Sequence, residues 1–316
     1  MLARTRPQGE PPTIRYVDRR TGELCTEIVL GEALVRYVYE RFFGRALRRS
    51  ILTRPLFSRA YGRWQSSSAS RRAIAKVVRD LAIAMDDFVV PSGGFASFND
   101  FFTRQLSPGA RPLDPDPGRM LSPADGRLFA FGNIHGDTLL PAKGRHISLA
   151  RLLGGAEPAK PFANGSALIV RLCPSDYHRF HFPCAGVAGA PALLRGPLES
   201  VNPYALARGR AILDHNQRQV TLVDSPRFGR VAYVEVGALC VGRIAQTFRP
   251  GPIEAGQEKG YFEFGGSTVV LVFEPGKLAL DEDLLGHTGR GLETLVRMGE
   301  GIGSALAPPV TSGAER

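Results

Sequence analysis

Residues 259–276 read Lys-Gly-Tyr-Phe-Glu-Phe-Gly-Gly-Ser-Thr-Val-Val-Leu-Val-Phe-Glu-Pro-Gly. The run 268–273 is apolar, rich in valine and bounded by turn residues, so it predicts a buried β-strand. Similar short apolar runs, separated by Gly, Pro, Asn and Asp, continue from about residue 119. No alternation with long helical segments accompanies them, which favours an antiparallel or mixed β-rich core. The predicted strands are 127–131, 166–172, 184–188, 219–223, 230–236, 240–247 and 268–273.

The first third of the chain has a different, helical pattern. Its apolar residues recur at helical spacing, and five prolines between residues 107 and 124 separate it from the β-rich part. The predicted helices are 31–64 with a break at Pro55, 69–87, 97–105 with Ser97 as N-cap, and a short one at 292–299. We therefore predict an α+β fold with an N-terminal helical region over 1–118 and a β-rich core over 119–316.

The positive charge is concentrated in one of these segments. Of a formal net charge of +10, the segment Gly31–Trp64 carries +6, from eight arginines and two glutamates. Basic, aromatic-rich helices of this kind fit contact with an anionic membrane surface, with the arginines reaching toward lipid phosphates. The alternative, that the apolar stripe is core and the arginines are solvated, stays open. No nucleic-acid partner is expected, because no helix-turn-helix, zinc or RNP signature accompanies the charge.

Cysteine usage indicates a reducing compartment, and the hydropathy of the chain indicates a soluble or peripheral protein. The four cysteines, Cys25, Cys173, Cys184 and Cys240, form no CxxC pair, so we expect neither a disulfide framework nor a metal site. No apolar run reaches the roughly 18 residues that a membrane-spanning helix needs, and the first residues lack the apolar core of a signal peptide. A soluble or peripheral protein on the cytoplasmic side is predicted.

The pair Gly266–Ser267 at the mouth of the predicted strand has the chemistry needed for a backbone to cut itself. A glycine carbonyl is unshielded, so the neighbouring serine Oγ can fold back and attack it. The resulting ester can eliminate and leave an N-terminal keto group in place of the serine. By itself the pair is weak evidence, because in a chain with 36 glycines it is more often a loop entering a strand.

Two further motifs supply the partners that such a serine requires. Residues 122–127 read Ser-Pro-Ala-Asp-Gly-Arg, and residues 176–181 read Asp-Tyr-His-Arg-Phe-His. Because a free hydroxyl is a poor nucleophile, we predict His181 as its base, with Asp125 orienting the ring and favouring its charged form. His178 lies three residues earlier, so a bend is required if both rings are to reach one site.

The three motifs resemble those of phosphatidylserine decarboxylase proenzymes in type, order and spacing, in the branch with a Gly-Gly-Ser-Thr cleavage site. The resemblance extends through Ser97–Phe102, 200–203 and 236–242. It implies an Asp125–His181–Ser267 triad and autocatalytic cleavage between Gly266 and Ser267. The products would be a β chain, 1–266, and an α chain, 267–316, that remain associated, with Ser267 converted to a pyruvoyl group.

The resemblance also implies the second reaction. The pyruvoyl group would withdraw electrons while phosphatidylserine loses its carboxylate, giving phosphatidylethanolamine and CO2, the role that PLP fills elsewhere. His178 would return a proton, and Ser200, Val201, Asn202 and Pro203 would face the substrate. The protein would act peripherally at the cytoplasmic side of the cell membrane, and a homodimer is left open.

Two departures from the family pattern leave the rate and head-group preference open. Gln217 stands where a glutamate is common, and Arg243 where serine or alanine is usual. Two other functions also stay open: a pyruvoyl decarboxylase of a soluble amino acid, and a non-catalytic protein that binds anionic lipid.

Overall fold

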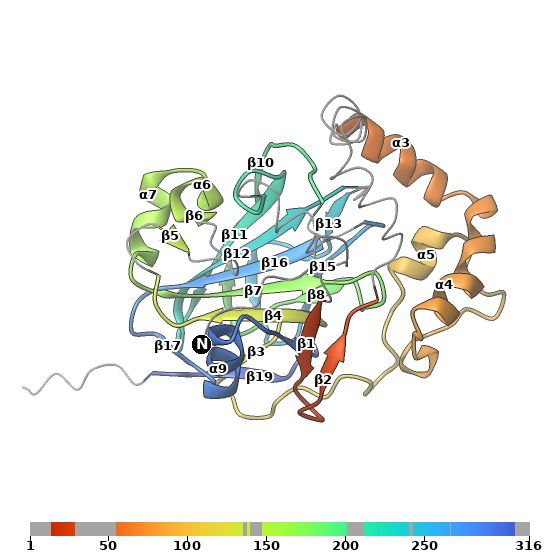
Figure 1. The fold of residues 1–316 in the computed structure, drawn as a ribbon. Helices are drawn as coiled ribbons and strands as arrows, with labels where there is room; N and C mark the ends of the chain where they lie inside the picture. Colours follow the sequence, from red (N-terminus) through yellow and green to blue (C-terminus); the bar gives the residue numbers. More distant parts are fainter. Residues whose placement is uncertain are drawn as a thin grey trace, which may run out of the picture.

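The computed structural model describes residues 14–28, 55–134, 138–139, 147–200, 212–239, 243–265 and 267–306 (Figure 1). Several predictions lie outside these residues. They concern the first part of the arginine-rich segment, residues 31–54, three substrate-facing residues, Val201, Asn202 and Pro203, and the glycine of the cleavage pair, Gly266.

The described chain is organised around one large mixed sheet. In the ranges given above it has eleven strands, and all neighbouring pairs are antiparallel except β1 and β18. The order is β14 (Gly251–Ile253), β9 (Gly186–Ala188), β11 (Arg218–Ser225), β12 (Gly229–Gly237), β16 (Ser267–Phe273), β7 (Ser166–Leu172), β4 (Gly126–Phe131), β18 (Glu293–Val296), β1 (Arg15–Asp18) and β2 (Leu24–Thr26), with β10 (Ala192–Leu194) on β11. The predicted β-rich, mixed core is confirmed.

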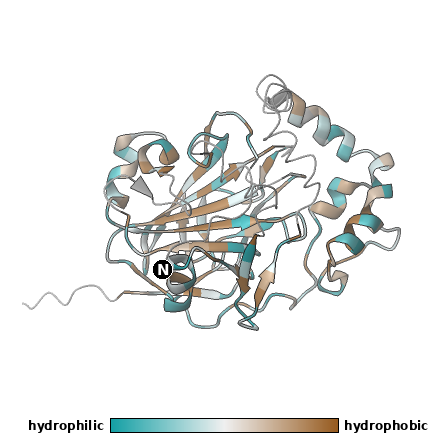
Figure 2. Cartoon of the chain, in the orientation of Figure 1, coloured by the Kyte–Doolittle hydropathy of each residue, from teal (hydrophilic) through white to brown (hydrophobic). Residues whose placement is uncertain are grey.

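The centre of this sheet is buried on both faces. Every residue of β7 and β16 is buried, which explains why these strands read as continuous apolar runs rather than as an alternation. Figure 2 shows this apolar colouring along the central strands. Alternate residues of β16 pack into two separate clusters, one on each face of the sheet. Strand β16 is therefore an interior strand, hydrogen-bonded on one side to β12 and on the other to β7.

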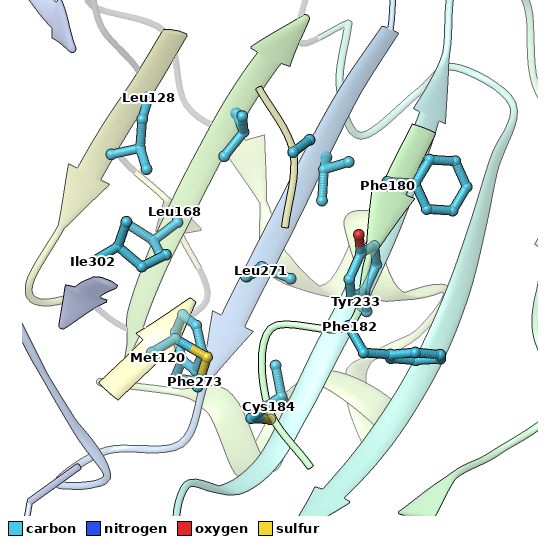
Figure 3. Packing of buried hydrophobic residues seen from close by; sticks show 14 of the residues in the cluster. Met120, Leu128, Leu168, Phe180, Phe182, Cys184, Tyr233, Leu271, Phe273 and Ile302 are labelled. Atoms are coloured by element: carbon cyan, nitrogen blue, oxygen red, sulfur yellow. The ribbon is translucent and has the colours of Figure 1, made fainter. Parts of the chain in front are cut away.

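Smaller layers cover the two faces. One cluster packs side chains of the main sheet, such as Tyr233 and Leu271, against Phe180 and Phe182 of a second layer (Figure 3). That layer holds two three-stranded sheets, β13 (Ile244–Gln246), β15 (Glu258–Phe262) and β8 (Arg179–His181), and β17 (Leu278–Leu280), β19 (Gly301–Ala305) and β3 (Arg119–Leu121). The other cluster is covered by α6 (Leu149–Leu153), α7 (Ala156–Ala159), η4 (Lys160–Phe162) and the pair β5 (Thr138–Leu139) and β6 (Ile147–Ser148).

A helical segment lies to one side of the sheets (Figure 1). It comprises α3 (Pro55–Gln65), η2 (Ser68–Ala73), α4 (Ile74–Asp80), η3 (Met85–Asp87) and α5 (Phe98–Phe102). Helix α3 begins at the predicted break, Pro55, and the predicted N-cap is confirmed, since Ser97 Oγ accepts from the Asp100 amide at 3.1 Å. The predicted helix 69–87 is interrupted, because the chain turns at Ala82, whose φ is 49°.

Two helix predictions are wrong. The segment 292–299 contains strand β18, and the helix of this region is α9 (Glu282–Gly289). Residues 14–28, placed in the helical region by prediction, form β1 and β2 instead. Both errors have one cause: β18 pairs with β4 and β1, so partners far away in sequence decide its conformation over the local apolar spacing.

None of the helices within the described residues is long and apolar enough to cross a membrane.

Candidate active site

Ser267 is the first residue of β16, and its side chain is fully buried. Its Cα lies opposite Gly237 of β12 and Leu172 of β7, so it occupies the middle of the sheet. Gly265, two residues before Ser267, has φ 145°, a backbone conformation that favours glycine. Ser267 Oγ has no hydrogen-bond partner within the described residues, and an unsatisfied buried hydroxyl is costly. Such a hydroxyl, at the predicted cleavage position, fits a group kept for reaction.

His178 lies just before β8 in an apolar site. The ring is fully buried, neither nitrogen has a partner among the described residues, and its centroid lies 3.8 Å from that of Phe102. Burial first, and then the charge of Arg104, hold the pKa of His178 well below its ordinary value. The ring is therefore neutral at pH 7. Its unused nitrogens mark it, like Ser267, as a polar group without a structural bond.

His181, at the end of β8, has both nitrogens occupied. Nδ1 lies 2.9 Å from the Gly256 carbonyl, so Nδ1 carries the proton and donates it, while Nε2 accepts from the Tyr177 hydroxyl at 3.1 Å. Burial lowers the pKa of His181, and the Gly256 contact and the charges of Glu258 and Asp125 oppose that shift. The carboxylate of Asp125 is thus close enough to act on the ring by its charge, although no hydrogen bond joins them.

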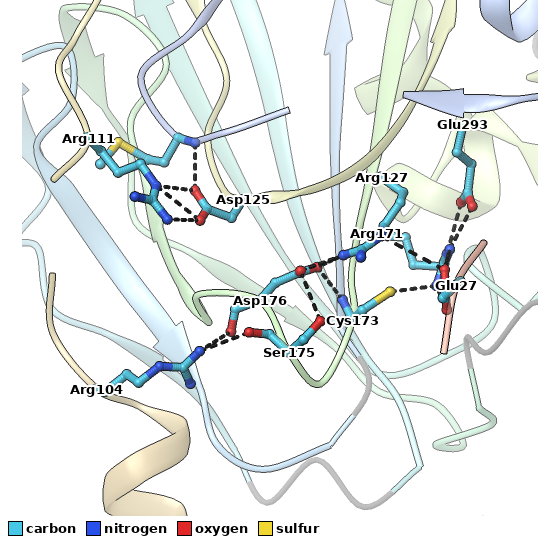
Figure 4. Close-up of polar contacts among 11 residues, drawn as sticks. Glu27, Arg104, Arg111, Asp125, Arg127, Arg171, Cys173, Ser175, Asp176 and Glu293 are labelled. Atoms are coloured by element: carbon cyan, nitrogen blue, oxygen red, sulfur yellow. Dashed lines mark hydrogen bonds and ion pairs between the residues drawn. The ribbon is translucent and has the colours of Figure 1, made fainter. Parts of the chain in front are cut away.

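Asp125 is bound by an arginine instead. Arg111 Nη2 lies 2.7 Å from Oδ2, and the Met298 amide donates to Oδ1 at 2.8 Å (Figure 4). Arg111 also pairs with Asp87 at 2.8 Å. Burial lowers the pKa of Arg111, but its hydrogen bonds and charge contacts with the two aspartates raise it above the ordinary value. The guanidinium therefore neutralises the carboxylate that the sequence assigned to His181.

Of the predicted triad, His181 borders a cavity, and the three residues do not form a hydrogen-bonded chain within the described residues. A cavity of about 280 Å³ is lined by Arg111, Tyr177, His181, Glu258 and Met298, among others. Two of these residues bind Asp125, so the cavity brings His181 and the surroundings of Asp125 together. Within the described residues no hydrogen bond links Ser267 to His181, or His181 to Asp125.

An arginine network fixes the turn that carries His178. The Asp176 carboxylate is bound by Arg127 and accepts from the Cys173 amide at 2.7 Å (Figure 4). Arg104 Nη2 donates to the carbonyls of Ser175 at 2.9 Å and Asp176 at 3.0 Å. These contacts hold the connection from β7 to β8. Sequence reasoning missed the roles of these arginines and of Arg111, because nothing in the sequence distinguishes Arg111 from Arg119, which lies nearer to Asp125.

The two departures from the family pattern lie apart from the triad. Arg243 is mostly exposed, pairs with Glu263 at 3.2 Å, and borders a second cavity of about 370 Å³. Its side chain therefore points to the surface and adds no bulk or charge to the core. The Gln217 amide donates to the Pro197 carbonyl, and the Gln217 carbonyl accepts from the Gly237 amide, both at 2.9 Å. Ser200 is partly buried in the connection after β10.

A buried ion pair, which sequence reasoning also missed, lies on the Ser267 side of the sheet. Lys259 of β15 binds Glu235 of β12, and neither side chain is exposed. Lys259 Nζ also donates to Gln246 Oε1 at 2.8 Å. Glu235 lies opposite Val269, two pairs along the ladder from Gly237 and Ser267, so its side chain is on the same face as Ser267. The burial of Lys259 could not be predicted from an alternating apolar pattern, because a register shift between residues 258 and 260 interrupts that pattern in β15.

Removing one member of this pair is expected to destabilise the fold strongly. We expect Lys259→Ala to lower the free energy of unfolding by about 3–5 kcal/mol, because Glu235 would remain buried without its partner. The double variant Lys259→Met/Glu235→Leu removes both charges and is expected to be about as stable as the parent. Urea unfolding of the three proteins measures this, in a background that cannot self-cleave. A double variant as unstable as the single one would contradict it.

Comparison with known protein families agrees with the sequence motifs. The profile of the phosphatidylserine decarboxylase family matches residues 98–304, from α5 to β19. The chain is 43% identical over 293 residues to a phosphatidylserine decarboxylase proenzyme of Chlamydia trachomatis, covering 92% of this chain and 97% of that protein.

Proteins of the same name in more distant bacteria match over the same length. The protein of Clostridium kluyveri is 41% identical, covering 92% of this chain and 98% of its own. That of Fusobacterium nucleatum is 38% identical, covering 92% and 97%. The similarity therefore includes the helical segment as well as the sheets that position Ser267 and the two histidines.

Proposed function

Because this chain belongs to the phosphatidylserine decarboxylase family, we propose that it removes the carboxylate of phosphatidylserine, forming phosphatidylethanolamine and CO2, after cutting itself between Gly266 and Ser267. The observation that carries the proposal is Ser267 Oγ at the entry to β16, which is buried and has no hydrogen-bond partner within the described residues, in a chain that matches the family over most of its length. The cut would leave chains 1–266 and 267–316, both contributing strands to the main sheet.

Self-cleavage uses the chain's own atoms. Ser267 Oγ attacks the carbonyl carbon of Gly266, and the peptide bond is exchanged for an ester. Elimination across Ser267 then breaks the ester, releases residue 266 as a carboxylate, and leaves an unsaturated N-terminal residue whose hydrolysis releases ammonia. His181 is the proposed base, supported by its place beside the Asp125 charge. For this role its Nε2 would exchange the Tyr177 hydroxyl for Ser267 Oγ, so the step requires a ring movement.

The pyruvoyl group fits the place where it would form. Among the described residues, none hydrogen-bonds to the Ser267 side chain, so its conversion would break no such bond, and the site is buried between two strands. When present, the group would withdraw electrons from the substrate as CO2 leaves. His178 is the proposed residue that moves a proton at the substrate α-carbon. An anionic substrate beside the ring would raise the pKa of His178 and so favour the form that donates.

We further propose that the helical region meets an anionic membrane from the cytoplasmic side. Support comes from the end of α3, where Arg63 is exposed and Trp64 is 55% exposed, a basic and aromatic pair suited to a membrane interface. The helical segment from α3 to α5 would then form the membrane-contact region and the sheets, with β1 and β2 among them, the catalytic core. Ser200, Val201, Asn202 and Pro203 would face the head group. A homodimer is compatible with this arrangement.

The function is tested on the purified wild-type protein with two substrates, phosphatidylserine in vesicles and free serine. Intact mass is expected to give two fragments, the smaller beginning at residue 267 with a blocked keto terminus. CO2 release is expected from phosphatidylserine in vesicles but not from free serine. Release from free serine instead would favour the soluble amino acid decarboxylase, and one uncut chain that binds vesicles would favour the lipid-binding alternative.

A further inference from the structure

The segment just before the predicted scissile bond is held by two helices. The backbone amide of Phe264 donates to Asn99 Oδ1 of α5 at 2.9 Å. The Phe264 ring lies edge-on to Phe98 and Phe102 of the same helix, with centroids 5.0 Å apart in each case. It also lies 5.9 Å from the ring of Tyr61 in α3. Phe264 is thus fixed both through its backbone and through its side chain.

Helix α5 is itself a firm support. Its first amide, that of Phe98, donates to Ser70 Oγ at 2.8 Å, and this hydroxyl donates to the carbonyl of Gln65, the last residue of α3, at 2.7 Å. Phe98, Phe101 and Phe102 are at most 3% exposed. The capped helix therefore cannot shift without breaking contacts to both α3 and η2.

The same helix links both proposed reaction centres. The Phe102 ring contacts both the His178 ring, with centroids 3.8 Å apart, and the Phe264 ring, with centroids 5.0 Å apart. Between Phe264 and Ser267 stand only two glycines, Gly265 and Gly266. Glycines populate many backbone conformations, so a freely moving segment would rarely present its carbonyl to Ser267 Oγ. An attack of this kind requires atoms about 3–3.5 Å apart and aligned, and a misplacement of about 1 Å can cost about 100-fold in rate.

We propose that Asn99 is a positioning residue for self-cleavage. Its side-chain oxygen fixes the Phe264 amide, the phenylalanine rings of α5 hold the Phe264 side chain, and the two glycines then span a defined distance to Ser267. The inference rests on the proposed cut at Gly266–Ser267. It assigns to α5 a role in the first reaction that is separate from acid–base chemistry.

The test compares two substitutions at one position. Asn99→Asp keeps an acceptor oxygen in the same place, whereas Asn99→Ala removes it. We expect Asn99→Ala to slow the appearance of the two fragments by about tenfold or more, and Asn99→Asp to cut within about threefold of wild type. Fragments are followed by intact mass after a pulse of cell-free synthesis. Asn133→Ala, at an exposed asparagine after β4, is the matched control and should cut like wild type.

Folding is checked in uncut proteins. Asn99→Ala combined with Ser267→Ala is expected to melt within a few degrees of Ser267→Ala alone, which separates slow cutting from loss of structure. If Asn99→Ala does not fold, the inference is tested with Phe264→Leu and Phe264→Ala instead. Both variants lack the aromatic ring at position 264, and both must cut more slowly than wild type. Equal cutting rates in wild type and Asn99→Ala, or in wild type and Phe264→Ala, overturn the inference. A wild-type chain that is never cut at residue 267 overturns the proposed self-cleavage instead.

Discussion

Ser267→Ala is expected to leave the protein as one 316-residue chain without decarboxylase activity. The alanine lacks the oxygen that attacks the Gly266 carbonyl, and it cannot be converted to a keto group. Both reactions should therefore fall to background, while the fold is retained, since Ser267 Oγ makes no hydrogen bond to any of the described residues. Intact mass and CO2 release from phosphatidylserine vesicles measure the two losses separately.

A second buried serine provides a matched control for this substitution. Ser166 is the first residue of the adjacent strand β7 and pairs with Phe273, at the far end of β16 from Ser267. It is also buried, and its hydroxyl likewise has no partner within the described residues. We expect Ser166→Ala to be cut and to remain active. Cleavage or activity in Ser267→Ala would show that another residue is the nucleophile, and equal losses in both variants would point to packing.

The two histidines are expected to separate the two reactions. We expect His178→Ala to be cut but to lower kcat for decarboxylation by about 10²–10⁴-fold, the usual contribution of a positioned proton donor. The basis is its environment: a buried, neutral ring whose nitrogens make no structural bond. His181→Ala is expected to fail earlier, at the cut, because His181 is the proposed base for Ser267.

The measurement is a time course of fragment formation followed by kinetics on the cut material. His287→Ala, at a histidine of α9 that contacts Thr294 at 2.9 Å, should affect neither reaction. Normal kcat in cut His178→Ala would remove His178 from the mechanism. Normal cutting by His181→Ala would leave Ser267 dependent on a different base, for which the nearby Glu235 carboxylate becomes the next candidate.

The sequence predicted those features that local patterns indicate and missed those that depend on residues far apart in the chain. The Ser97 cap depends on neighbouring residues, and strand β16, although its partners are distant, is a continuous apolar run, so local patterns were sufficient for both. Strand β18 depends on β1 and β4, which both lie far earlier in the chain, and local spacing suggested a helix there. The same limit applies to the site. The motifs identified the reactive residue types, but only the fold shows Arg111, rather than His181, on Asp125.

The position of β16 in the middle of the sheet determines whether the protein can refold after it has been cut. A cut before Ser267 makes this interior strand the start of a separate chain, held by hydrogen-bonded ladders on two sides and by packing on both faces. The fragments cannot part without opening the whole sheet. Once parted, they would have to meet again as two molecules, without the covalent link that brought β16 between its neighbours. The uncut chain can unfold and refold, whereas the cut enzyme depends on kinetic stability, and its assembly happens once.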